Sequence, residues 1–176
     1  NNVSNSATYT GLSAESSFRT LSNPPTSQAS GMSGSAVSNS QIDLSWSSAG
    51  FPSSGATVKQ YILLSALSPA TPSFTASNGS APTVGAGTTI VSSSVSAAAT
   101  SYSAIGLDAS TTYNFMLIPY TYDGTNNATY NYLTASAATA SASTTAGAAP
   151  ALSSSFATSI TNNSAVLGAT IDNDGG

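Results

Sequence analysis

Residues 100–120 read TSYSAIGLDASTTYNFMLIPY, and the fold of the rest of the chain can be worked out from this stretch. Two runs within it, residues 102–107 and 113–120, are rich in β-branched and aromatic residues. Between them lies the tetrapeptide Asp108-Ala109-Ser110-Thr111, whose composition is typical of a turn. The pattern predicts two β-strands joined by a tight connection.

Leu107 closes the first of these runs and Tyr113 opens the second, six positions later. A β-sandwich uses this spacing to place a leucine in its core and to fold a tyrosine back over the corner between two strands. The tyrosine hydroxyl then hydrogen-bonds the backbone upstream. We therefore expect Leu107 and Tyr113 to mark such a corner.

Two earlier runs also have a period of two. In Ile42-Asp43-Leu44-Ser45-Trp46 the apolar residues alternate with polar ones, which predicts a half-buried strand with Trp46 inside. In residues 58–64 both alternating faces are apolar, and Tyr61 lies on one of them. This favours a central strand that is partly covered on its outer side. The predicted structural core residues are Trp46, Tyr61, Leu107 and Tyr113.

Further strands are expected at both sides of these runs. The predicted strands cover residues 28–32, 41–46, 58–64, 88–94, 100–107, 112–120 and 133–143. Residues 65–87 contain three prolines and several glycines, so they are expected to form a long loop with at most a short edge strand.

The composition limits the function. Hydrophobic residues reach 40%, the net charge is only −4, and Ser and Thr make up roughly a third of the chain, so a folded β protein is expected. Arg19 and Lys59 are the two basic residues, too few for binding nucleic acid or anionic lipid. No apolar run approaches 18 residues, so no membrane insertion is expected in this segment. The low content of charged residues and the Ser/Thr/Asn/Ala bias favour an extracellular or cell-surface location, and secreted bacterial β repeats commonly lack cysteine, as this chain does.

Catalysis is not expected. The chain has no His and no Cys, which excludes Ser-His-Asp and Cys-His arrangements and His-ligated metal centres. The acidic residues are Glu15, Asp43, Asp108, Asp123, Asp172 and Asp174. Asp43 faces outward on its predicted strand and Asp108 and Asp123 lie in predicted turns, so none forms a catalytic pair. The oxygen-rich residues 172–175 are interpreted as a turn rather than a calcium loop. We predict no enzyme, no catalytic residue, no metal and no cofactor.

The two ends of the chain resemble parts of its centre. Residues 4–9 return as residues 125–130, an offset of 121 from Ser4 to Thr125. Residues 39–43 correspond to residues 163–167, an offset of 124 from Asn39 to Asn163. A repeat of this kind indicates an array of modules.

Three sets of residues give the centre a resemblance to the fibronectin type III family: Pro24-Pro25, residues 42–46, and Leu107 with Tyr113. The resemblance covers residues 24–146 and implies an all-β, immunoglobulin-like (fibronectin type III) sandwich in a tandem array. Residues 1–23 would then be the C-terminal strands of a preceding module. Residues 147–176 would be the N-terminal strands of a following immunoglobulin-like module.

Two kinds of surface site are candidates. Tyr122, Asn126 and Tyr130 offer rings and an amide to a glycan, although packing of Tyr120 and Tyr132 across neighbouring strands is the preferred interpretation of this tyrosine set. The acceptor pattern for N-glycosylation occurs at Asn2, Asn78, Asn127 and Asn162.

The resemblance implies a non-catalytic spacer or adhesive repeat of a bacterial or archaeal surface or secreted protein. Its partners would be neighbouring modules and surface glycans. Two alternatives stay open. One is a subunit of an extracellular filament assembled by donated β-strands, and the other is an accessory carbohydrate-binding module of a secreted hydrolase.

Overall fold

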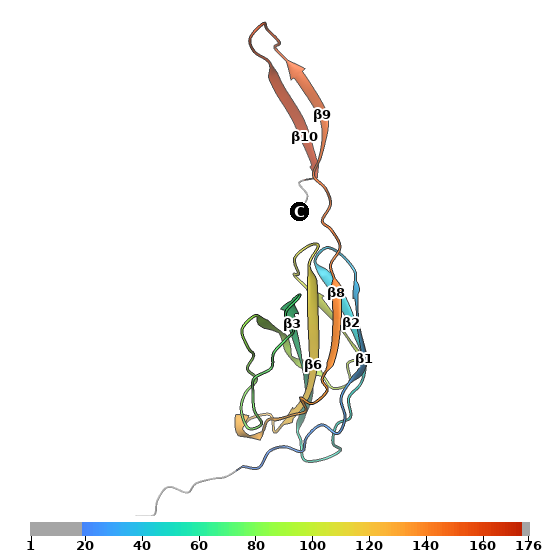
Figure 1. Cartoon of the computed structure of the whole chain (residues 1–176), viewed down its shortest axis with the longest axis vertical. Coiled ribbons are helices and arrows are strands. Elements are labelled where there is room, and N and C mark those ends of the chain that lie inside the picture. The colour runs from blue at the N-terminus through green and yellow to red at the C-terminus, as the bar shows by residue number, and fades with distance from the viewer. Residues whose placement is uncertain (1–18, 174–176) are drawn as a thin grey trace, which may run out of the picture.

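The computed structural model describes residues 19–173, which are almost entirely β-structure (Figure 1). The elements are β1 Ser30–Ala36, β2 Gln41–Ser47, β3 Val58–Leu67, β4 Thr88–Ser96, β5 Ser101–Ile105, β6 Thr112–Tyr122, the 3-10 helix η1 Asn127–Thr129, β7 Asn131–Tyr132, β8 Ala138–Ser143, β9 Ala151–Thr158 and β10 Val166–Asn173. Within residues 19–173, no helix has the length and apolar character needed to cross a bilayer.

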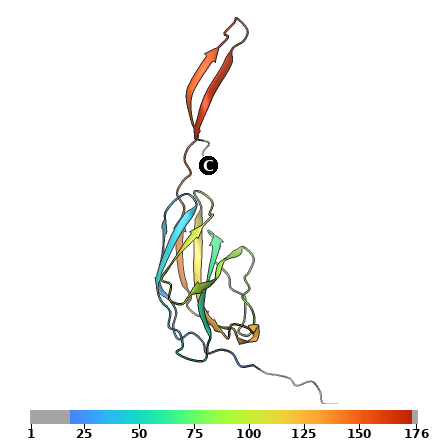
Figure 2. The same cartoon turned by 180° about the vertical axis from the view of Figure 1, so that it is seen from behind.

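Residues 24–146 form two antiparallel sheets that face each other (Figures 1 and 2). One sheet has the order β1-β2-β5. The other has the order β4-β3-β6-β7, and β8 also pairs with β6. The prediction of an all-β, immunoglobulin-like sandwich is therefore confirmed.

The core lies between the sheets. Ile42, Leu44 and Trp46 alternate inward along β2, where each is buried. Across from them lie Tyr61 and Phe115 from the other sheet, and the rings of Trp46 and Tyr61 meet edge to face at 5.9 Å between centroids. Because of this strict alternation, one face of β2 is buried in the core and the other is exposed to solvent.

The connection between β5 and β6 crosses from one sheet to the other. At this corner the backbone N–H of Asp108 donates a hydrogen bond to the Tyr113 hydroxyl at 3.0 Å. Leu107 is partly buried and packs against the core from the same connection. The expected tyrosine corner is thus present in the structure.

A second apolar cluster covers the outer side of β3 and β6. Ile62 and Leu64 point away from the main core and are nevertheless fully buried. They are covered by the loop of residues 68–87, which folds back over the sheet and contributes Phe74 and Val84. These two residues form an isolated β-bridge within the loop, and no strand is assigned in residues 68–87. β3 is therefore a central strand that is covered on both faces.

The last strand of the sandwich begins later than the predicted residue 133. β8 starts at Ala138, because Ser136 adopts a left-handed backbone with φ of 57° that interrupts an extended strand. The side-chain amide of Gln28 donates to the carbonyls of Leu133 (2.6 Å) and Ala135 (2.8 Å). These bonds take the place of a strand ladder in this segment.

β9 and β10 form a separate antiparallel hairpin that lies beyond one end of the sandwich (Figure 1). Leu167 lies opposite Ala157 and Ile171 opposite Leu152 in its register. Residues 174–176 and 1–18 lie outside the described residues. The predicted turn at residues 172–175 falls partly among them, and Asp172 and Asn173 belong to β10.

Candidate functional site

The tyrosines predicted as a glycan site form a column of rings on the outer side of β6. The ring of Tyr130 stacks on that of Tyr122, with 4.5 Å between the ring centroids and 3° between the ring planes. It also stacks on Tyr132, with 5.5 Å between the centroids and 10° between the planes. Tyr120 and Tyr132 are opposite each other in the β6–β7 register, and both are buried. The structure therefore brings Tyr122 and Tyr130 together with the two tyrosines that pack across the strands.

This column limits what a sugar could contact. Sugars stack on a free aromatic face, and both faces of Tyr130 are covered by Tyr122 and Tyr132. Tyr122, at the end of the column, is partly exposed. The side-chain oxygen of Asn126 accepts a hydrogen bond from the N–H of Ala128 at 2.9 Å and caps η1. Tyr122 and Tyr130 are both partly exposed, and the stacking between them reduces the ring surface that a sugar could contact.

Burial raises the pKa of Tyr120 and Tyr132 well above the ordinary value of 10.0, and the neighbouring tyrosines add to the effect. The pKa of Tyr130 is raised for the same reasons. The hydroxyls of Tyr120 and Tyr132 also donate hydrogen bonds, to Ser93 O and Ser80 O at 2.7 Å each. Tyr120 and Tyr132 therefore act as hydrogen-bond donors that tie the outer layer to the sheet.

Asp123 organises the loop that follows β6. One carboxylate oxygen accepts the backbone N–H groups of Thr125 (2.8 Å) and Asn126 (2.7 Å), and these bonds lower its pKa to about 2. The turn needs Gly124, whose φ of 91° is strained for other residues. The other carboxylate oxygen pairs with Arg19 at 2.9 Å. The expected Asp123-Gly124 turn is thus held by the aspartate itself.

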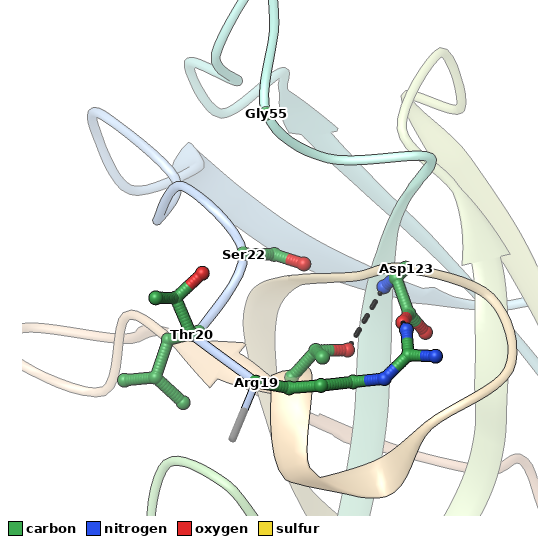
Figure 3. Close-up of a pocket in the computed structure, with 7 residues that line it drawn as sticks. Arg19, Thr20, Ser22, Gly55 and Asp123 are labelled. Carbon is green, nitrogen blue, oxygen red and sulfur yellow. Dashed lines mark hydrogen bonds and ion pairs between the residues drawn. The ribbon is translucent and has the colours of Figure 1, made fainter. Parts of the chain in front are cut away.

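The chain that enters the sandwich lies beside this loop, and the two enclose a shallow polar hollow of about 400 Å³ (Figure 3). Its lining consists of Arg19, Thr20, Leu21, Ser22, Gly55, Asp123 and Thr129. In Figure 3 the Arg19 guanidinium reaches across the hollow to the Asp123 carboxylate. The two charges form an ion pair at the rim of the hollow, and the Arg19 side chain remains 55% exposed.

Three of the four predicted glycosylation sites lie among the described residues, and all three asparagines are exposed. The side-chain oxygen of Asn78 accepts the N–H of Tyr132 at 2.8 Å. Asn127 opens η1, and the hydroxyl of its partner Thr129 is directed inward to Asn126 O at 2.8 Å. Asn162 lies in the β9–β10 turn. Asn2 lies outside the described residues.

The sequence reasoning missed the residues that anchor the incoming chain. Thr121 and Asn131 are buried polar side chains that hydrogen-bond the backbone of residues 22 and 23. One signal could have revealed Thr121: it occupies an inward position in the alternation Tyr113, Phe115, Leu117 of β6. A hydroxyl at such a position requires a partner. Among residues 19–173, no group of three acidic residues could hold a metal ion.

Comparisons with known proteins give no family. No protein-family model matches the sequence, and no curated protein matches it. A computationally redesigned β-sandwich protein shares 12% identity with a TM-score of 0.38, covering 70% of this chain and 90% of that chain. A structure of titin kinase and its flanking domains shares 17% identity with a TM-score of 0.34, covering 67% of this chain and 16% of that chain.

Proposed function

We propose that the chain is a non-catalytic structural repeat segment of an extracellular surface protein, in which fibronectin type III-like sandwiches follow one another as a spacer or adhesive stalk. The observation that carries this proposal is the β9–β10 hairpin, which exposes apolar side chains on both faces. The exposed residues are Leu152, Phe156, Ile160, Val166, Leu167 and Ile171.

The register assigns these side chains to two faces. Leu152, Leu167 and Ile171 share one face, and Phe156 and Val166 share the other. A two-stranded hairpin alone is marginally stable in water, and these side chains gain free energy only when further strands cover them. The hairpin therefore has apolar surface on both faces that further strands could cover.

Residues 24–146 contain a hairpin of the same kind at their start. β1 and β2 are antiparallel neighbours, as β9 and β10 are. The sequence offset of 124 aligns Ile42 near the start of β2 with Val166 at the start of β10. This correspondence supports a second module whose first strand, β9, follows the connecting residues 147–150.

The path of the chain suits a stalk. Residues 19–23 join the sandwich at one end, and the segment after β8 leaves from the opposite end (Figures 1 and 2). Modules joined in this way add length along one direction. The low content of charged residues, 5%, supports a role through short-range contacts rather than electrostatic steering.

The proposal can be tested on the unmodified chain. Sedimentation velocity measures its oligomeric state, and hydrogen exchange measures the protection of its backbone amides. We expect a monomer in which β3 and β6 amides exchange slowly and β9 and β10 amides exchange orders of magnitude faster, because the hairpin has no cover. A monomer whose β9 and β10 amides are as protected as those of β3 would contradict the proposal.

The same experiment identifies the filament alternative, which the free edges of the hairpin favour. β9 and β10 pair only with each other within residues 19–173, so each has one edge open to a donated strand. Concentration-dependent polymers with protected β9 and β10 amides would support assembly by strand donation in place of a spacer.

A further inference from the structure

Residues 19–23, named here the N-terminal strap, dock on the sandwich through their backbone. All four backbone polar groups of Ser22 and Asn23 are hydrogen-bonded to it. The N–H of Ser22 donates to Thr129 O and the N–H of Asn23 donates to Gly55 O, both at 2.9 Å. The carbonyl of Ser22 accepts from the Asn131 side chain at 2.8 Å, and that of Asn23 accepts from the Thr121 hydroxyl at 2.7 Å.

Two of the groups that receive the strap are buried side chains: Thr121 is fully buried, and Asn131 is nearly so. Thr129 contributes its backbone carbonyl, because its hydroxyl donates to Asn126 O and accepts the N–H of Asp123. With the strap in place, the Thr121 hydroxyl and the Asn131 side-chain amide find their acceptors in the strap's carbonyls, as buried polar groups require. These three residues belong to the short list of buried polar residues in the described chain, to which Ser22 of the strap also belongs.

Two further contacts fasten the strap at its ends. The Asn23 side chain donates to Ser54 O at 3.0 Å, and Arg19 pairs with Asp123 at 2.9 Å. Pro24-Pro25 follows at once, and prolines fix their backbone φ and limit hinge motion. The strap therefore has contacts from its first residue to the start of the sandwich.

We propose that the surface formed by Thr121, Thr129 and Asn131 is a docking site for an extended backbone, that residues 19–23 occupy it, and that the occupied site fixes the direction in which the chain enters the sandwich. The structural boundary of the module then lies at or before Arg19, and Asp123 is a positioning residue for both the strap and its own loop. The importance of this direction for a stalk rests on the proposed function, whereas the docking itself does not.

Trypsin reports the state of the strap directly, because Arg19 and Lys59 are the two trypsin sites of the chain. Lys59 lies on the central strand β3, so cleavage after it measures global unfolding. Cleavage after Arg19 requires the strap to leave its site. Mass spectrometry separates the two products, and a synthetic peptide of residues 13–26 gives the rate for an undocked strap.

In the wild-type chain we expect cleavage after Arg19 to be at least about tenfold slower than in the peptide, because several hydrogen bonds must open together. Thr121→Val removes one bond to the strap and keeps the shape of the side chain. We expect it to accelerate cleavage after Arg19 about fivefold. Thr112→Val is the matched control, since Thr112 lies at the other end of β6 and bonds Ser143.

A wild-type rate equal to that of the peptide would overturn the docked strap. If Thr121→Val also accelerates cleavage after Lys59, this variant is unfolded and cannot test the strap. The variant Asn23→Ala then tests it. This exposed side chain donates only toward Ser54 O, and its removal should accelerate Arg19 cleavage about twofold with Lys59 unchanged. If the rate of cleavage after Arg19 is unchanged both in Asn23→Ala and in a folded Thr121→Val, the docked strap is refuted. The proposed function as an array of modules would not be affected by this result.

Discussion

Tyr113 illustrates how one residue fixes the relation of two sheets. Its ring packs in the core beside Phe115, at 6.2 Å between centroids, while its hydroxyl accepts the N–H of Asp108. The ring is held by β6 and the N–H belongs to the connection from β5, which lies in the other sheet. The bond thus joins the two layers at the point where the chain crosses between them.

Tyr113→Phe keeps the ring and removes this bond. We expect the free energy of unfolding to fall by about 1 kcal/mol, the usual net value of one hydrogen bond, measured by urea denaturation followed through Trp46 fluorescence. Tyr102→Phe, in the neighbouring strand β5, is the control for loss of a hydroxyl outside the corner. Equal stabilities of Tyr113→Phe and the wild type would show that the corner contributes nothing.

At the scale of elements, β2 and β3 differ in what their outward residues meet. The outward residues of β2, such as Asp43 and Ser45, are exposed to solvent. The outward residues of β3, such as Ile62 and Leu64, lie under the loop of residues 68–87. The loop is therefore a third layer, and the sandwich has two apolar clusters in place of one.

Ile62→Ala measures the contribution of this layer. Removing a fully buried aliphatic side chain typically costs about 2–5 kcal/mol, and we expect a loss in this range by chemical denaturation. Ser47→Ala, at an exposed outward position of β2, should change stability by less than about 0.5 kcal/mol. A loss below about 1 kcal/mol for Ile62→Ala would mean that the loop does not exclude water from β3.

The tyrosine column makes alkaline pH a second test of the outer layer. The pKa values of Tyr120, Tyr130 and Tyr132 are raised in the folded chain, mainly by burial. In the unfolded chain they ionise near 10. The folded state thus holds these protons longer, so this contribution to stability is complete below pH 10 and is lost as the pH rises above it.

A spectrophotometric titration of tyrosinate should therefore show fewer than the eight tyrosines of the chain ionised at about pH 11 in the native state. In urea all eight should titrate together near pH 10. Tyr132→Phe should remove one of the late groups. A native curve that superimposes on the urea curve would contradict a buried column.

At the scale of the whole molecule, the two-sheet sandwich could be predicted from the sequence, whereas the N-terminal strap and the late start of β8 could not. Period-two alternation and the spacing from Leu107 to Tyr113 are local signals, and they indicated both layers and the corner. The strap depends on pairs such as Ser22 with Asn131, which are 109 positions apart, and no local pattern encodes such pairs. The late start of β8 depends equally on Gln28, more than a hundred positions earlier.

The candidate glycan site shows the same division. From the sequence, Tyr122 and Tyr130 were expected to lie close together, and they do. The stacking of Tyr130 on both Tyr122 and Tyr132 depends on how β7 pairs with β6. Proximity follows from short separation along the chain. The free face of a ring follows only from packing.

The third layer also gives the module two unlike flanks. On the β4-β3-β6 side, the folded-back loop covers Ile62, Leu64 and Ile118 of the central strands. On the β1-β2-β5 side, small hydroxyls such as Ser33 and Ser45 face outward and bond each other at 3.0 Å. Under the proposed function, two modules lying side by side would meet through the hydroxyls of this outer face, with Ile105, which is 73% exposed, as an apolar contact on it.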